Sequence, residues 1–310
     1  MLGRFISATN YLDFLARGRR EASPLLEFEP DTMKSHYNRA PFQITHRLAD
    51  HPYFSLEELF ALCRRMPPEM IPYRIGSIPG DADLDSSYDR YKKALTLDDV
   101  LDHFEDNRAY ICINNPERDA QFRPLIEGLL SEITAQIDPL DPWISWYSTY
   151  IFISTRDSVT PYHMDREMNF LLQIRGNKTV HLWDPSDNEI MSPAQKDLLL
   201  SRVGDRPAYH PSFESKAMTF ALKPGVGLHH PFIAPHRVHT GPELAVSLAL
   251  TFRTQQSDRW TDAHRFNARM RRWGMNPTPV GSNVLMDRAK SGITRMGQRA
   301  RRTPASVDAP

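Results

Sequence analysis

Short runs in which apolar and polar residues alternate dominate the middle of this chain. They predict strands over residues 109–113, 146–154, 169–174, 178–183, 218–222, 225–228 and 245–253. Turn residues separate several of them, at Gly176-Asn177, Pro224-Gly225 and Gly241-Pro242. This succession of short strands suits a double-stranded β-helix (jelly roll), whose interior can hold a small site.

Segments with helical periodicity flank these strands. Ser55 and Glu58 form a capping box ahead of a helix over about 55–65, which Pro67-Pro68 ends. The same periodicity predicts helices over residues 96–105, 122–137, 194–201, 260–273 and 284–302. Residues 74–92 have the composition of a polar loop, and residues 1–50 give no clear element. We therefore expect a mainly β fold with flanking helices.

The pattern divides the chain into three regions. Residues 1–105 form an N-terminal α/β region that packs on the core, and residues 106–255 form the β-helix. Residues 256–310 form a basic helical region with a disordered tail, Thr303–Pro310. This last region has 11 basic and 4 acidic residues, a net charge of +7. Its last helix carries an apolar stripe made of Leu285, Ala289, Ile293, Met296 and Ala300.

Composition excludes several classes of protein. Lys and Arg total 38, as do Asp and Glu, so general nucleic-acid binding is not indicated. No apolar run is long enough to span a bilayer, and the N-terminus lacks the apolar core and cleavage site of a signal peptide. Cys63 and Cys112 are the only cysteines, so no disulfide framework is implied. The expected location is cytoplasmic, with free thiols.

The chemistry centres on His163 and Asp165. Two residues apart on an extended backbone, their side chains share one face and can converge on one point. A histidine from a distant strand would complete the set of two histidines and one carboxylate that holds non-haem Fe(II) and leaves three positions open. The candidates are four histidines, His229, His230, His236 and His239. His236 and His239 have opposite strand parity, so an unbroken strand cannot point both at one metal, and His229-His230 lies one strand segment earlier.

A lysine follows the turn at Gly176-Asn177. If this turn closes a two-residue hairpin, Arg175 faces Lys178 across it. Counting back by twos from Arg175 reaches Asp165 and His163, so Lys178 is expected on the metal side. A lone lysine facing a barrel interior needs an anionic partner. The distal carboxylate of 2-oxoglutarate would supply one.

This stretch resembles the JmjC and cupin-like (Cupin_8-type) Fe(II)/2-oxoglutarate oxygenases, especially the branch that contains the asparaginyl hydroxylase of the hypoxia pathway. The shared pattern is T-P-x-H-x-D, then N-F, Q-I and a basic-Gly-x-Lys turn. Here it comprises Thr160, Pro161, His163, Asp165, Asn169, Phe170, Gln173, Ile174, Arg175, Gly176 and Lys178. H-x-D alone recurs by chance, whereas the ordered constellation is specific.

The resemblance implies a ligand set. It implies Fe(II) ligation by His163 and Asp165, and it favours His236 as the third ligand, because the family places this histidine after a Gly-rich turn and a proline-containing strand. It implies 2-oxoglutarate contacts from Lys178, Thr160 and Asn169, with O₂ as the second cosubstrate. Two further cosubstrate contacts are considered, Thr251, which stands where the branch has an asparagine, and Arg253, an alternative clamp.

The activity implied is a 2-oxoglutarate-dependent dioxygenase, a hydroxylase of a protein or peptide side chain or of a small molecule. The alternatives are a non-enzymatic cupin/JmjC-like transcriptional regulator or ligand-binding protein, and a cupin enzyme without cosubstrate. The retained ligands and Lys178 favour the first. No helix-turn-helix or zinc-finger pattern is present, so no specific nucleic-acid partner is expected. Related oxygenases often dimerise through C-terminal helices, which favours a homodimer here.

Overall fold

The computed structural model describes residues 3–6, 11, 13, 16, 23–80, 82, 84–92 and 95–302. Contacts within the chain divide it into two compact units. The first comprises Met1–Pro185 and Ala208–Thr254, and the second comprises Ser186–Pro207 and Gln255–Pro310.

The first unit contains a large antiparallel sheet of nine strands. Its order is β2-β3-β11-β8-β13-β6-β5-β4, and β1 adds to β6. These strands are β1 (Arg4–Phe5), β2 (Leu26–Glu27), β3 (Phe42–His46), β4 (Tyr73–Ile75), β5 (Ala109–Asn114), β6 (Ile144–Ser154), β8 (Met168–Arg175), β11 (Val226–His230) and β13 (Ala245–Thr254). The longest ladder joins β6 and β13, which pair along nearly their whole length.

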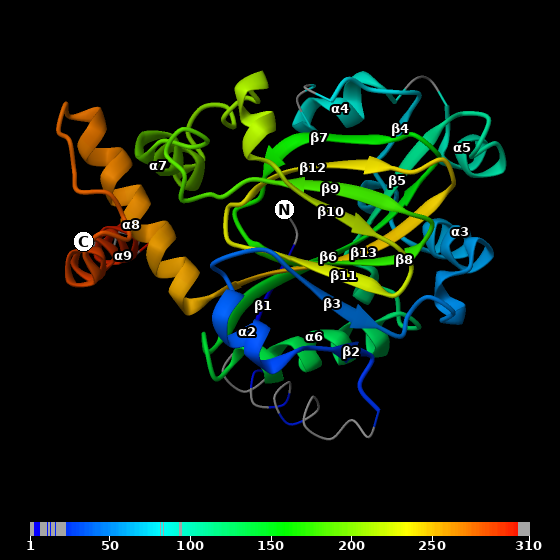
Figure 1. Ribbon diagram of the computed structural model, residues 1–310, viewed down its shortest axis with the longest axis horizontal. Coiled ribbons are helices and arrows are strands. Elements are labelled where there is room, and N and C mark those ends of the chain that lie inside the picture. The colour runs from blue at the N-terminus through cyan, green and yellow to red at the C-terminus, as the bar shows by residue number, and fades with distance from the viewer. Residues whose placement is uncertain are drawn as a thin grey trace, which may run out of the picture. The chain divides into compact units, whose positions relative to one another are not determined.

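A smaller sheet of four strands faces it (Figure 1). Its order is β10-β9-β12-β7, made of β7 (Val159–Met164), β9 (Lys178–Leu182), β10 (Met218–Leu222) and β12 (Pro235–Thr240). Apolar side chains from both sheets fill the space between them, namely Leu171, Leu228 and Ala249 from the large sheet and Val180, Leu182, Leu222 and Val238 from the small one. The protein has the expected double-stranded β-helix core, mainly β with flanking helices.

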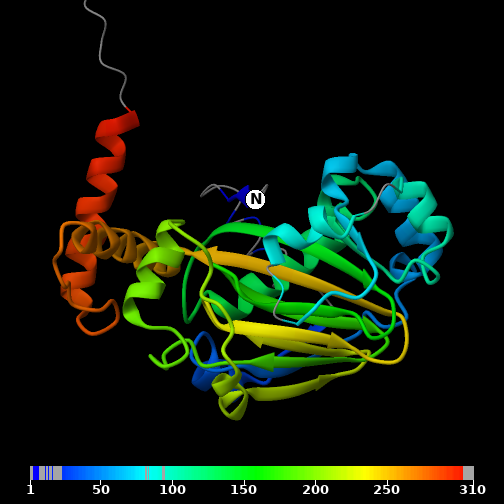
Figure 2. The ribbon, with the colours of Figure 1, turned by 90° about the horizontal axis from the view of Figure 1, so that it is seen from above.

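Helices cover the rest of the first unit. Along the outer side of the large sheet lies α6 (Arg123–Ile137), and α2 (Pro30–His36) lies nearby (Figure 1). The remaining helices of this unit are α3 (Leu56–Arg65), α4 (Leu84–Arg90) and α5 (Leu97–Asp102), with 3₁₀ turns η1 (Pro52–Phe54), η2 (Pro68–Met70), η3 (Pro116–Arg118) and η4 (Pro211–Lys216). Figure 2 shows α3, α4 and α5 grouped at one end of the sheets. Ser55 caps α3 as the sequence predicts, by accepting from the Glu58 amide.

The second unit is helical and comprises α7 (Pro193–Ser201), α8 (Gln255–Arg272) and α9 (Val284–Arg302). A buried carboxylate holds α7 to α8, because Asp197 contacts His264 at 2.7 Å and Arg271 at 2.8 Å. The polar side of α9 faces α8. The Thr294 hydroxyl donates to the Asp262 carbonyl, and Arg295 pairs with the Asp262 carboxylate at 2.7 Å.

The apolar stripe of α9 is consequently exposed. The residues Leu285, Ile293 and Met296 are 75%, 52% and 72% exposed. Side chains beyond Gln298, and the tail Thr303–Pro310, lie outside the described residues. A helix that buries its polar side and exposes its apolar side has a face available for a partner.

Three features differ from the sequence-based expectations. Residues 74–92 contain β4 and α4, because Tyr73–Ile75 pairs with β5. Residues 186–207 group with the C-terminal helices instead of the β-helix. The hairpin at Gly176-Asn177 is wrong, since β8 and β9 belong to different sheets and do not pair. No described helix is long and apolar enough to cross a membrane.

Candidate metal centre

Two histidines meet across neighbouring strands of the small sheet. His163 on β7 and His236 on β12 are direct cross-strand partners, so their side chains project to the same face. Their ring centroids are 4.1 Å apart, and both residues are buried. Asp165 follows the end of β7, where the chain leaves the small sheet for β8.

These three side chains converge as a metal site would require. One ligand atom from each of His163, Asp165 and His236 lies within 4.8 Å of the others, and no other such group occurs among the described residues. The Asp165 carboxylate is 4.0 Å from Nε2 of His236. A metal about 2 Å from each atom fits this spacing after small side-chain rotations. We call His163, Asp165 and His236 the metal triad.

Backbone carbonyls orient both histidines in the same way. Nδ1 of His163 lies 2.8 Å from the Pro161 carbonyl, and Nδ1 of His236 lies 3.0 Å from the Ala234 carbonyl. A carbonyl can only accept, so in the neutral rings Nδ1 carries the proton. Nε2 then keeps its lone pair, the arrangement found behind metal-bound imidazoles. The donor set therefore fits a divalent metal such as Fe(II).

Lys178 opens β9 and points between the sheets. It pairs with Thr240 of β12, on the same side as His236 and Val238. It is 4% exposed, and its ammonium lies 5.9 Å from the Phe152 ring centroid. Burial, then the positive charge of Arg74, lowers the pKa of Lys178 to about 7. No carboxylate among the described residues pairs with it, so this cation is poised for an anion.

A second buried cation, not identified from the sequence, lies close to Lys178. Arg74 on β4 stacks on the Tyr110 ring at 4.0 Å and donates to the Val159 carbonyl at 2.6 Å. The Tyr110 hydroxyl lies 3.2 Å from the Thr160 hydroxyl. The structure thus brings predicted Thr160 together with Tyr110, which sequence spacing could not link because 50 residues separate them.

The other two predicted cosubstrate contacts lie side by side on the large sheet. Asn169 of β8 pairs with Thr251 of β13, and both are buried. Oδ1 of Asn169 has no hydrogen-bond partner, which leaves an acceptor for a bound group. The Thr251 hydroxyl instead donates to the Ser148 carbonyl. Only its lone pairs remain for a ligand.

The rival histidines occupy three different environments. His239 lies on the opposite face of β12 from His236, with its ring 5.8 Å from that of His181. His229 is a satisfied core residue, because Nδ1 contacts the Asn169 carbonyl and Nε2 accepts from the Asn38 amide. His230 is buried with its ring 4.7 Å from that of His236, but it is outside the metal triad.

The alternative clamp lies elsewhere. The Arg253 guanidinium is 4.7 Å from the Trp146 ring and 5.9 Å from the Phe5 ring. The inward-facing residues of β13 follow one another as Ser247, Ala249, Thr251 and Arg253. Ser247 pairs with Gln173 of β8, at the end of the strand near Lys178, and Arg253 lies at the other end. Arg253 and Lys178 therefore stand at opposite ends of the barrel.

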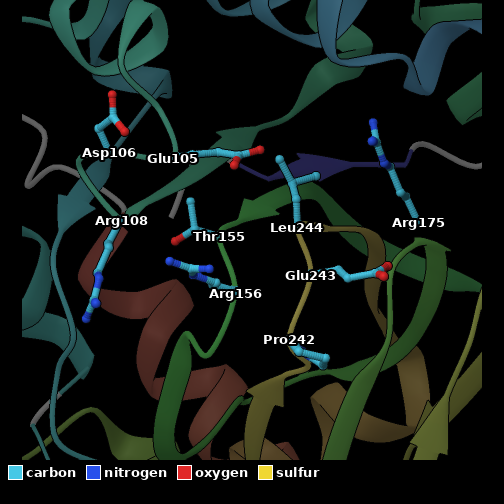
Figure 3. Close-up of a pocket in the computed structure, with 9 residues that line it drawn as sticks. All are labelled: Glu105, Asp106, Arg108, Thr155, Arg156, Arg175, Pro242, Glu243 and Leu244. Atoms are coloured by element: carbon cyan, nitrogen blue, oxygen red, sulfur yellow. The ribbon is translucent and has the colours of Figure 1, made fainter.

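A separate pocket of about 650 Å³ lies near the turn that precedes β9 (Figure 3). It is lined by basic and acidic side chains in equal number, with Thr155, Pro242 and Leu244. The charged residues are Arg108, Arg156, Arg175, Glu105, Asp106 and Glu243. The metal triad and Lys178 are not among its lining residues, so it is distinct from the metal site.

The chain can now be compared with known proteins. The model of the cupin-like domain family matches residues 72–258. The comparison with curated protein sequences gives no match. Among solved structures, YcfD of Escherichia coli is 14% identical, with 90% of this chain and 69% of that chain covered and a TM-score of 0.46. A second structure is described as YcfD, a ribosomal oxygenase from Escherichia coli in complex with cobalt and 2-oxoglutarate. It is 16% identical, covers 90% of this chain and 69% of that chain, and has a TM-score of 0.43.

Proposed function

This chain belongs to the cupin-like domain family, and on that premise we propose that it is an Fe(II)- and 2-oxoglutarate-dependent oxygenase. The observation that carries the proposal is a metal triad and an unpaired buried cation, Lys178, inside one barrel. A metal triad alone fits many reactions. A buried amine without an acidic partner keeps its charge when an anionic ligand pairs with it, so Lys178 favours a reaction with an anionic cosubstrate.

Each residue of the site has a definite role in this proposal. His163, Asp165 and His236 hold the metal on one face and leave its other positions open. Lys178 binds the far carboxylate of 2-oxoglutarate, assisted by the hydroxyls of Thr160 and Tyr110. Asn169 and Thr251 contact the cosubstrate from the large sheet. When bound, iron and 2-oxoglutarate supply the oxidation of a substrate C–H bond by O₂, with release of succinate and CO₂.

The protein itself supplies position and exclusion of water. Apolar residues of both sheets, including Leu171, Val180 and Val238, surround the site. The Asp165 side chain is 29% exposed, which leaves the metal triad accessible from one side. We propose hydroxylation of a protein or peptide side chain, or of a small molecule, at this open side. Buried free thiols at Cys63 and Cys112 agree with the proposed cytoplasmic location.

Uncoupled turnover tests the proposal. Protein supplied with Fe(II), ascorbate and 2-oxoglutarate should release succinate, and candidate substrates should increase the rate. His163→Ala and Asp165→Ala should each abolish iron binding and succinate release, while the circular dichroism spectrum stays unchanged. His239→Ala serves as a control histidine on the outer face. Full succinate release by the His163 variant would refute the site.

A further inference from the structure

His230 is a buried residue near the metal triad whose two ring nitrogens both lack a hydrogen-bond partner. It ends β11, pairs with Asn169 of β8, and is 3% exposed. A neutral imidazole carries one N–H donor and one lone pair, and leaving both buried without partners costs free energy. Such a residue is explained if a ligand reaches it.

The preceding residue provides a contrast within the same strand. His229 points to the opposite face of β11, where its two nitrogens contact the Asn169 carbonyl and the Asn38 amide. Its ring also packs between Tyr37 and Phe42. His229 is therefore a structural residue with its hydrogen bonds complete. The lack of partners belongs to His230, the member of the pair that faces the metal triad.

The position of His230 limits what can reach it. Across the large sheet, His230, Asn169 and Thr251 are consecutive partners on β11, β8 and β13. Together they form a polar row facing the metal triad, in which the Thr251 hydroxyl proton is already used by Ser148. The donors left in this row are a ring N–H of His230 and the side-chain amide of Asn169. Asp165 marks the exposed side of the site, so a group at His230 must be small enough to enter fully.

We propose that His230 binds 2-oxoglutarate by donating a ring N–H to the carboxylate next to the oxo group. This inference rests on the proposed function, because it assigns a further contact to the same cosubstrate. Lys178 opens β9 at the other end of the barrel interior, so the two residues bind opposite ends of one small dicarboxylate. A neutral imidazole carries one ring N–H, so His230 can make this contact without a charge of its own.

Calorimetric titration of the Co(II)-loaded protein tests this without turnover. The two ligands are 2-oxoglutarate and pyruvate, a 2-oxo acid that lacks the far carboxylate. His230→Phe, which keeps a ring and removes the nitrogens, should weaken binding of both ligands by roughly tenfold to a hundredfold. Lys178→Met should weaken binding of 2-oxoglutarate and leave pyruvate unchanged. His230→Gln, which restores an N–H donor, should recover most of the affinity.

Metal binding and stability separate this role from the alternatives. His230→Phe should keep the Co(II) affinity of the wild type and should not lower the unfolding temperature of the metal-free protein, whereas His229→Phe should lower it. Unchanged binding of both ligands to the Phe and Gln variants would overturn the inference alone. Loss of Co(II) from either variant would also overturn it and make His230 a ligand. Failure of the metal-loaded wild type to bind 2-oxoglutarate would overturn the proposed function as well.

Discussion

Lys178 is the residue proposed to bind the far carboxylate of 2-oxoglutarate, so its substitution should change how tightly the cosubstrate binds. A charge-assisted contact in a buried pocket contributes on the order of 1.5–3 kcal/mol. Lys178→Met should therefore raise the 2-oxoglutarate concentration needed for half-maximal succinate release by roughly tenfold to a hundredfold. Iron affinity should stay the same, because Lys178 is not in the metal triad. An unchanged requirement would remove Lys178 from the site, and Arg253 would be the next residue to substitute.

The lowered pKa of Lys178 adds a pH dependence. Its pKa falls from 10.5 to about 7 in the folded protein, by burial first and then by Arg74. Between these values the unfolded chain binds a proton that the folded protein lacks, so ligand-free stability rises with pH. Lys178→Met should stabilise the ligand-free protein most below pH 7 and least near pH 10. Urea unfolding at several pH values measures this difference.

The same titration should weaken the cosubstrate complex. Because only the ammonium pairs with the carboxylate, 2-oxoglutarate affinity should fall above about pH 7, approaching tenfold per pH unit. Calorimetry of the metal-loaded wild type between pH 6.5 and 9 measures this slope. Lys178→Met provides the control, since its weaker affinity should lack this slope. Equal slopes in both proteins would assign the titration to another group.

The third ligand can be assigned by comparing two histidines of one strand. His236 of β12 is the cross-strand partner of His163 on β7, whereas His239 lies near His181 on the other face of β12. His236→Ala should reduce Fe(II) binding to the level of His163→Ala, and His239→Ala should leave it near wild type. Metal content after dialysis against Fe(II) under argon measures both. The opposite ranking would mean that β12 presents its other face to the metal.

At the scale of residues, local spacing was informative and distant contacts were not. H-x-D places two side chains on one face over three residues, so the sequence could predict their convergence. The stacking of Arg74 on Tyr110, and the contact of Tyr110 with Thr160, join three strands far apart in sequence. Likewise, nothing local distinguishes the satisfied His229 from the unpartnered His230.

At the scale of elements, the direction of Lys178 was predicted correctly for an incorrect reason. The sequence argument assumed that side chains alternate between the two faces without interruption from His163 to Lys178. The chain instead changes sheet twice, between Met164 and Met168 and again at Gly176-Asn177. Lys178 faces inward because β9 pairs with β12 and places it opposite Thr240. Alternation predicts that a strand exists, but not which sheet it joins.

Gly176 permits the second change of sheet. Its φ is +64°, and a Cβ added there would lie 2.3 Å from the Leu244 carbonyl oxygen. Gly176→Ala should therefore destabilise the protein by about 2 kcal/mol or more, from backbone strain and from displacement of the loop before β13. It should also weaken 2-oxoglutarate binding, because Lys178 is two residues away. Urea unfolding and calorimetry measure the two effects.

Gly76 gives a matched control in the same unit. Its φ is +75°, but nothing lies within 4 Å of an added Cβ. Gly76→Ala should cost only the left-handed backbone strain, about 1–2 kcal/mol. It should leave cosubstrate affinity unchanged. Equal losses in stability and affinity for the two variants would show that the close approach at Gly176 is unimportant.

At the scale of the whole molecule, the C-terminal helices show which face of α9 is buried within its own unit and which face is exposed. The sequence predicted both long helices and the apolar stripe of α9. It could not predict that the buried residues among those described in that helix would be Asp287, Lys290, Ser291 and Thr294. The partners of three of them come from elsewhere in the unit, namely the Gly281 amide for Asp287, the Thr278 carbonyl for Lys290 and the Asp262 carbonyl for Thr294. The apolar stripe is left without a partner within its own unit.

A second copy of the chain is the partner we expect for this stripe. Leu285, Ile293 and Met296 lie on one side of α9, and each is more than half exposed. Burying them against the same face of another copy would remove apolar surface at about 25 cal/mol per Å². The wild type should sediment as a dimer. Leu285→Glu with Met296→Glu should give a folded monomer, because the substituted residues are exposed and leave the polar contacts with α8 intact.

The matched variant keeps the stripe apolar. Leu285→Met with Met296→Leu should sediment as a dimer, since hydrophobicity and volume are nearly conserved. Deletion of residues from about 256 should remove the dimer and reduce stability, because Asp197 of the retained α7 loses its partners His264 and Arg271 of α8. Sedimentation velocity at several concentrations measures all four proteins, namely the wild type, the two double variants and the deletion. Salt-sensitive DNA binding by the intact protein that is lost on this deletion would instead assign the basic helices to nucleic acid.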